Sequence, residues 1–244
     1  MSSKPGAAIA RRPFVTLNAA MTVDGKIDTY LRSGARISSS ADLYRVDRLR
    51  AEVDAVMVGG RTLNREDPSL VVRSAVFREE RESSGRDPNP AKVAITTRAD
   101  FDVGGRFATT GPARRIVYTT TQADSAHLAT LRDAGFEVFV CGTERVDLAF
   151  ALSSLGDLGI ARLLLEGGGT LIAAFFAMQL VDELSVYVAP RIFGGTSAPS
   201  MVDGAGFTAT QAPALSLVSA ERFDAEGGVL LRYRAPMEEG NSTR

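Results

Sequence analysis

The sequence predicts an α/β fold in which a doubly wound, mostly parallel sheet carries an antiparallel C-terminal hairpin. Short apolar runs alternate with segments of helical periodicity along the 244 residues. These runs are almost continuously apolar, as in strands that are buried on both faces of a parallel sheet. The last two runs are separated by residues 224–228, a glycine-containing segment typical of a hairpin turn.

The expected elements follow this alternation. Strands are expected at residues 14–18, 54–58, 92–97, 115–119, 136–140, 162–165, 183–189, 217–223 and 229–233. Helices are expected at residues 41–51, 125–134, 146–155 and 170–178. Residues 74–90 are polar and charged and are expected to form an exposed, mobile loop. Without internal repeats, one domain is expected at residues 13–235, between flexible tails at 1–12 and 236–244.

The composition argues against nucleic-acid, membrane and zinc binding. The net charge is −1, with 28 basic and 29 acidic residues, so no overall field attracts nucleic acid or an anionic membrane. The longest apolar stretch, residues 171–178, is far shorter than the roughly 20 residues of a membrane span. The single cysteine, Cys141, cannot form an internal disulfide, and no zinc-binding spacing occurs. We expect a cytoplasmic protein without a metal.

Few ionisable groups are available for catalysis. His127 is the only histidine, and its polar surroundings at a helix start indicate a surface residue. The sequence contains no serine-hydrolase elbow, zinc-protease or phosphate-loop motif. A reaction whose difficult step is carried out by a bound cofactor needs fewer such groups, so the sequence favours cofactor chemistry.

Two glycine turns directly follow predicted strands, at Gly59–Gly60 and at Gly167–Gly169. Glycine lets the backbone approach a ligand, and a helix N-terminus offers free N–H groups to an anion, so both turns suit a pyrophosphate. Tight turns without a ligand are the alternative. At the end of another strand, Thr97 and Arg98 could select a ribose 2′-phosphate, and hence NADP over NAD; a solvated arginine is the alternative.

Arg50 is the most informative charged residue. It shares a helix face with Leu43 and Val46, at i, i+3 and i+7, whereas Arg45 and Arg48 are expected to point elsewhere. An inward arginine needs an anionic partner, which is either a structural carboxylate or a substrate phosphate. Arg73 could supply a second guanidinium. The neighbouring Glu66 and Asp67 suit either acid–base work or a turn before Pro68.

Six segments together resemble the riboflavin-biosynthesis pyrimidine reductases, the C-terminal domain of the bifunctional deaminase-reductase and its stand-alone relatives. The similar segments, in matching order and spacing, are residues 17–27, 36–39, 50–54, 58–62, 67–73 and 165–171. The resemblance covers residues 13 to about 235 and implies a dihydrofolate-reductase-like fold. No zinc-deaminase signature is present, so the chain is similar to the reductase alone.

The resemblance implies a function and a set of site residues. It implies NADPH-dependent reduction of the ribosyl group of a ribosylaminopyrimidine 5′-phosphate, with hydride transfer to C1′ of the ring-opened imine. The implied cofactor-binding residues are Gly59, Thr62, Asp67, Thr97, Arg98, Gly167, Gly168, Gly169 and Thr170. The implied substrate-binding residues are Asn18, Ser38, Arg50, Glu66, Leu70, Arg73 and Glu166. Among these, Arg50 and Arg73 would hold the 5′-phosphate, and Glu166 would be catalytic, orienting the substrate or stabilising the imine.

The chain departs from the family at two positions. The family usually has aspartate where Glu66 stands, and tryptophan or a similar residue where Arg36 stands. Asn18 favours the 2,5-diamino pyrimidinone substrate slightly over its deaminated dione. Another dihydrofolate- or pterin-type reductase and a non-catalytic NADP-binding module are the alternatives. A homodimer is expected from the family and from the apolar residues 186–188 and 229–231.

Overall fold

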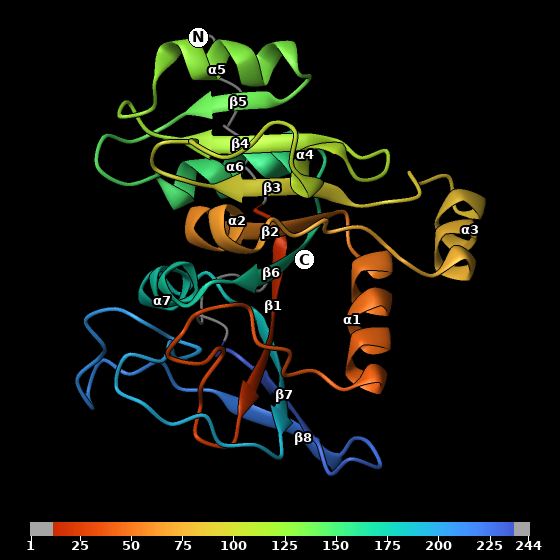
Figure 1. The fold of residues 1–244 in the computed structure, drawn as a ribbon, viewed down its shortest axis with the longest axis vertical. Coiled ribbons are helices and arrows are strands. Elements are labelled where there is room, and N and C mark those ends of the chain that lie inside the picture. Colours follow the sequence, from red (N-terminus) through yellow and green to blue (C-terminus); the bar gives the residue numbers. More distant parts are fainter. Residues whose placement is uncertain (1–11, 237–244) are drawn as a thin grey trace, which may run out of the picture.

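The computed structural model describes residues 12–236, which form a nine-stranded sheet with the order β5-β4-β3-β2-β6-β1-β7-β9-β8 (Figure 1). Neighbouring strands from β5 to β7 are parallel, and β9 runs antiparallel to both β7 and β8. The strands are β1 (Phe14–Thr22), β2 (Ala55–Gly59), β3 (Ala91–Ile95), β4 (Arg115–Thr119), β5 (Glu137–Val140), β6 (Arg162–Gly167), β7 (Glu183–Ala189), β8 (Ser216–Arg222) and β9 (Val229–Arg234). The predicted fold class is confirmed.

Seven helices connect these strands within residues 12–236. They are α1 (Ser40–Glu52), α2 (Gly60–Glu66), α3 (Ala75–Ser83), α4 (Arg106–Thr109), α5 (Ser125–Asp133), α6 (Leu148–Asp157) and α7 (Gly169–Ala177). Side chains cap several N-termini: Ser39 accepts from the Asp42 N–H, and Asp147 accepts from the Phe150 N–H. The four predicted helices are confirmed as α1, α5, α6 and α7, whereas α2, α3 and α4 are not among the predictions.

Alternating side chains of the strands divide between two buried clusters. One contains Leu17 and Leu165 from the sheet, with Leu152 of α6 and Phe175 of α7 packed on it. The other contains residues that point to the opposite face, such as Val56, together with apolar residues of α2 and α5. Because both faces are covered, the strands need apolar residues at consecutive positions, which explains their continuous apolar runs.

The predicted loop at residues 74–90 is in part a helix, so that prediction is wrong. Helix α3 begins after Ser74, whose hydroxyl accepts from the Phe77 N–H, and it packs beside α1 at the side of the sheet (Figure 1). Phe77 is the main apolar anchor and is 5% exposed. A single large apolar residue on the inward face leaves little helical periodicity to detect.

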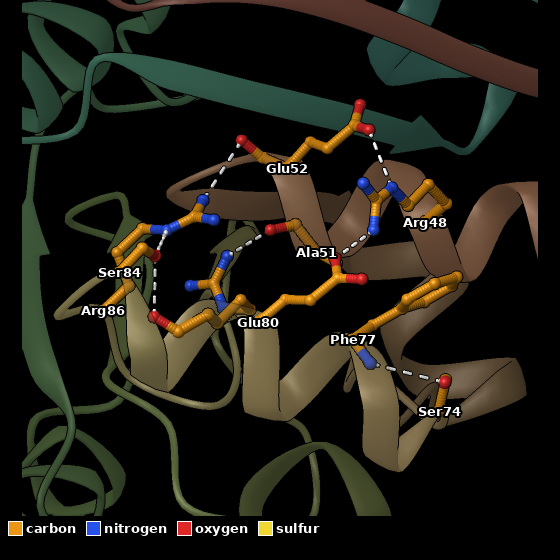
Figure 2. Close-up of polar contacts among 9 residues, drawn as sticks. Arg48, Ala51, Glu52, Ser74, Phe77, Glu80, Ser84 and Arg86 are labelled. Atoms are coloured by element: carbon orange, nitrogen blue, oxygen red, sulfur yellow. Dashed lines mark hydrogen bonds and ion pairs between the residues drawn. The ribbon is translucent and has the colours of Figure 1, made fainter.

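Charged side chains complete the contact between α1 and α3 (Figure 2). Arg81 of α3 is only 3% exposed and donates to the carbonyls of Ala51 and Val53, at 2.9 and 2.7 Å. On the outer side, Arg48 pairs with Glu52 of its own helix and with Glu80 of α3. A buried arginine is acceptable here because carbonyls at the end of α1 satisfy its charge and its donors.

The predicted tails lie outside the described residues, apart from Arg12 and Pro236. Arg12 forms an ion pair with Asp182 at 2.7 Å. The single-domain boundaries at residues 13 and 235 stay a prediction. Among residues 12–236, no helix has the length and apolar character needed to cross a membrane.

Candidate active site

The two glycine turns lie side by side at the carboxyl ends of β2 and β6. Val58 of β2 pairs with Gly167 of β6, so the strands that lead into the turns are direct neighbours. A Cβ atom added to Gly168 would come within 2.8 Å of Thr62 Oγ1 on α2. Gly167 has a φ of +108°, which favours glycine, and the Gly167–Gly168 peptide bond is cis. The turns therefore lie together at one edge, at the side of a parallel sheet where ligands bind.

The end of β3 adjoins the same edge. A Cβ atom added to Gly60 would lie 2.6 Å from Thr96 Oγ1, so the first turn of α2 sits directly against this strand end. Thr97 uses its carbonyl to accept from the Thr120 hydroxyl at 2.8 Å. Arg98 is exposed and makes no ion pair or side-chain hydrogen bond with any residue between 12 and 236. A positive charge is thus available beside the glycine turns.

Arg50 and Glu166 form a two-pronged ion pair behind this edge. Arg50 Nε and Nη2 each donate to one Glu166 carboxylate oxygen at 2.7 Å, and the two side chains are 13% and 12% exposed. Although burial acts against the charged guanidinium, the Glu166 carboxylate raises the pKa of Arg50 above its usual value. The prediction that Arg50 points inward is confirmed. In the structure its anionic partner is a carboxylate of the chain itself.

The segment that carries Leu70 and Arg73 is fixed next to this pair. Both oxygens of Asp47 on α1 accept backbone N–H groups, from Arg73 at 2.6 Å and from Ser74 at 2.8 Å. Arg50 Nη1 also donates to the Val71 carbonyl at 3.3 Å. Leu70 is fully buried with a φ of +51°. The exposed Arg73 guanidinium has no partner within the described chain, so it is free to bind an anion.

Glu66 and Asp67, which follow each other at the end of α2, have different surroundings. The pKa of Glu66 is raised, because its carboxylate is partly withdrawn from water and lies near the like charges of Asp28 and Glu166. Asp67 accepts from the N–H groups of Arg106 and Phe107 at 2.5 and 2.8 Å, and so caps α4. Contact of Asp67 with a cofactor stays a prediction.

Ser38 lines a cavity that the other predicted site residues do not line. It lines a cavity of about 360 Å³ at the end of β7, together with Arg36, Tyr187, Arg191 and five further residues. None of the other predicted substrate- or cofactor-binding residues lines this cavity. Arg36, one of the two positions that depart from the family, is part of its wall.

Helix α1 also directs Arg45 towards the sheet, so the prediction that Arg45 points elsewhere is wrong. Arg45 donates to Asn18 of β1 at 2.7 Å and to Ser185 of β7 at 3.0 Å. The buried residues of α1 are Asp42, Asp47 and Ala51, and the predicted apolar stripe is only half-buried. Two buried carboxylates define the inward face, a pattern that apolar periodicity does not detect.

His127 differs from its predicted surface position. It is half-buried, and its ring meets that of Phe101 edge-on at 6.5 Å. This contact makes it part of the packing of α5. Among residues 12–236, no group of histidine, cysteine, aspartate and glutamate side chains could hold a metal ion.

Comparison with known protein families assigns the chain to one of them. Residues 13–227 match the model of the RibD C-terminal domain. The chain belongs to the RibD C-terminal domain family. The resemblance expected from the sequence is thereby confirmed.

Two archaeal members of the family are similar over most of their length. The chain is 41% identical to a protein of Archaeoglobus fulgidus, over 80% of this chain and 89% of that one. It is 42% identical to a protein of Methanothermobacter thermautotrophicus, over 80% and 86% of the two chains. Both relatives are named 2,5-diamino-6-ribosylamino-4(3H)-pyrimidinone 5′-phosphate reductase. By contrast, the matched region is 50% of RibD from Bacillus amyloliquefaciens, at 31% identity.

Solved structures share the fold. A pyrimidine reductase-like protein of Corynebacterium diphtheriae has a TM-score of 0.78 at 21% identity, with 93% of each chain covered. RibD of Acinetobacter baumannii has a TM-score of 0.75 at 26% identity, with 92% of this chain and 58% of that chain covered. The RibD family fold thus extends over nearly the whole described chain.

Proposed function

We propose that this protein is an NADPH-dependent reductase that converts the ribosyl group of a ribosylaminopyrimidine 5′-phosphate to ribityl in riboflavin biosynthesis. The observation that carries the proposal is the gathering of the glycine turns, the Arg50–Glu166 pair and the free Arg73 at one edge of the sheet. The archaeal relatives' name makes the 2,5-diamino pyrimidinone the favoured substrate over the deaminated dione.

The glycine turns fit a dinucleotide. At Gly60 and Gly168, a Cβ atom would meet Thr96 Oγ1 at 2.6 Å and Thr62 Oγ1 at 2.8 Å, so the missing side chains let both turns pack closely against their neighbours at this edge. Backbone N–H groups at the start of α7, with Gly59, Thr62 and Gly167 to Thr170 around them, would hold the phosphates of NADPH. Thr97 and Arg98 would contact the 2′-phosphate. When bound, NADPH supplies the hydride.

The substrate is assigned to the neighbouring part of the same edge. Arg73, with a free guanidinium, would bind the 5′-phosphate, and Arg50 would add its positive charge from behind the Glu166 carboxylate. Glu66, Leu70, Asn18 and Ser38 would complete the substrate side. Ser38 would contact the substrate from the cavity at the end of β7.

Glu166 would act on the reacting sugar. Reduction at C1′ requires the ribosylamine to open to an imine, and the imine is a strong electrophile when protonated. A carboxylate beside it stabilises the positive charge and orients the carbon that accepts hydride. The Arg50 contacts hold the Glu166 carboxylate in one orientation, so little reorganisation accompanies the reaction.

A cytoplasmic homodimer is the proposed state of the enzyme. The apolar residues 186–188 and 229–231, which suggest the dimer, belong to the paired strands β7 and β9, where Val188, Val229 and Leu231 are half-buried. Edge strand β8 also exposes Leu217 and Val218, at 59% and 57%. Sedimentation that detects only monomer at micromolar concentration would exclude the dimer. The buried free thiol of Cys141 suits a reducing compartment.

A direct assay tests the function. NADPH oxidation is measured with the 2,5-diamino pyrimidinone phosphate, with its deaminated dione, and with dihydrofolate as a control. We expect turnover with a ribosylaminopyrimidine phosphate and none with dihydrofolate. Turnover with dihydrofolate alone would indicate another type of reductase. Tight NADPH binding without turnover on any of the three would indicate a non-catalytic NADP-binding module.

A further inference from the structure

Arg45 is a nearly buried arginine that contacts neither glycine turn. Its side chain is 11% exposed and pairs with Asp42, which is fully buried, at 2.7 Å. Its guanidinium also donates to the Ser185 hydroxyl and the Asn18 side-chain oxygen, at 3.0 and 2.7 Å. An arginine withdrawn from water to this extent requires such a complete set of partners. The contacts therefore tie α1 to β1 and β7 through one rigid, planar group.

The Arg45 contact fixes the orientation of the Asn18 amide. A guanidinium has donors and no acceptor, so the amide must present its oxygen to Arg45. The Asn18 nitrogen then points away from Arg45. This nitrogen makes no hydrogen bond within residues 12–236. It is also not among the side-chain atoms that are both fully buried and without a partner, so it is accessible from outside the protein. Asn18 therefore offers its N–H donors to a ligand, whereas its oxygen is turned towards Arg45.

Asn18 is close to the proposed reaction site. Strands β1 and β6 pair in parallel through Leu17 and Leu165, so Asn18 and Glu166 occupy the next positions of adjacent strands. Both side chains receive a guanidinium from α1, Asn18 from Arg45 and Glu166 from Arg50. The amide and the carboxylate thus face the same side of the sheet.

We propose that Arg45 is a positioning residue that makes Asn18 a fixed hydrogen-bond donor to the substrate. The inference deepens the proposed function and rests on it. The group that meets Asn18 must then be an acceptor, such as a ring carbonyl oxygen or an unprotonated ring nitrogen. Without Arg45, the amide can rotate and present its oxygen to the substrate. This weakens the hydrogen bond to the substrate acceptor and the preference for substrates that carry such an acceptor.

Asn18→Asp separates positioning from folding. A carboxylate keeps an oxygen for Arg45 and forms a charge-assisted bond with it, so the thermal stability is maintained. The same change removes the N–H donors. We expect the KM for the pyrimidine to rise by about tenfold or more, the effect of losing one buried hydrogen bond, with the NADPH affinity unchanged. A KM equal to that of the wild type would overturn the proposal.

A double-mutant cycle tests whether Arg45 acts through Asn18. Arg45→Met and Asn18→Ala are made singly and together, and steady-state kcat and KM are measured for the pyrimidine substrate. Arg48→Met, on the exposed side of the same helix, is the matched control. If Arg45 acts through Asn18, the double variant raises KM no more than Asn18→Ala alone. If Arg45 only supports the fold, the two effects multiply, and this result overturns the positioning role.

Further outcomes are distinguishable. If Arg45→Met does not fold, Arg45→Lys replaces it, since lysine keeps the charge beside Asp42 but loses the planar fork. If the wild-type enzyme is active and the KM effects of Arg45→Met and Asn18→Ala multiply in the double variant, the positioning role is rejected and the proposed function is unaffected. A wild-type protein that oxidises NADPH with neither pyrimidine phosphate rejects both proposals together.

Discussion

Arg50 on α1 and Glu166 at the end of β6 satisfy each other's charge through two hydrogen bonds of 2.7 Å, with only 13% and 12% of their side chains exposed. Neither charge can be removed without leaving the other poorly solvated. The pair therefore links the stability of the fold to the orientation of the carboxylate proposed to act in catalysis.

Separate and combined substitutions of this pair should have different effects on stability and activity. Arg50→Met and Glu166→Met should each lower the free energy of unfolding by about 2–4 kcal/mol, the cost of an uncompensated buried group. Arg50→Met/Glu166→Met should recover most of this loss, because both charges are gone, yet should remain inactive. Urea denaturation and kcat/KM measure the two effects. A double variant as unstable as the sum of the single ones would contradict the argument.

Arg73 is expected to bind substrate without supporting the fold. Its backbone is held by Asp47, whereas its exposed guanidinium has no partner in the described part of the chain. Arg73→Ala should therefore raise the KM for the pyrimidine phosphate by about tenfold or more, the effect of a lost charge-assisted bond, and leave NADPH affinity unchanged. Arg132→Ala, an exposed arginine of α5, is the control. Unchanged KM and kcat in Arg73→Ala would exclude a phosphate contact.

The strands were predictable from the sequence, but the inward faces of the first and third helices were not. Central strands such as β2 are buried on both sides, so their residues are apolar without interruption, whereas the exposed edge strand β8 was recognisable from the hairpin turn that follows it. Helix α3 instead buries Arg81 against carbonyls, and α1 buries Asp42 and Asp47. Hydropathy treats such residues as exposed, since only their partners in the folded chain make burial acceptable.

The candidate site was predictable to the extent that its chemistry lies in local motifs. Glycines after strands indicate a close backbone approach, and both turns lie where that argument placed them. The Arg45–Asn18 contact joins residues 27 positions apart, and it depends on how α1 crosses the sheet. No local pattern specifies that crossing, so the inward direction of Arg45 does not follow from the sequence.

Arg98 is expected to set the preference between the two nicotinamide cofactors. It is exposed, without a side-chain partner among residues 12–236, and follows the strand end that adjoins Gly60. Arg98→Ala should raise the Kd for NADPH by about tenfold, because a phosphate loses a charged donor, and should change the Kd for NADH little. Titration of cofactor fluorescence measures both constants. Equal losses for the two cofactors would show that Arg98 does not contact the 2′-phosphate.

Lys92 should make the stability depend on pH in the alkaline range. The side chain is fully buried, and its Nζ donates to the carbonyls of Phe107 and Thr110, at 2.9 and 2.7 Å. Burial, assisted by the like charge of Arg115, lowers its pKa to about 8. Because the unfolded chain keeps the ordinary lysine value of 10.5, above about pH 8 the unfolded state binds the proton that the native state has lost.

A rise in pH therefore favours the native state through this group. Between pH 7.5 and 9.5, Lys92 should add about 2 kcal/mol to the free energy of unfolding. Lys92→Met removes the titration, so urea denaturation at the two pH values should show this gain in the wild type but not in the variant. Other titrating groups contribute equally to the wild type and the variant, so they cancel when the two pH dependences are subtracted. One such group is Tyr118, whose pKa is raised by burial to about 12. A pH dependence identical in both proteins would mean that Lys92 stays protonated despite its burial.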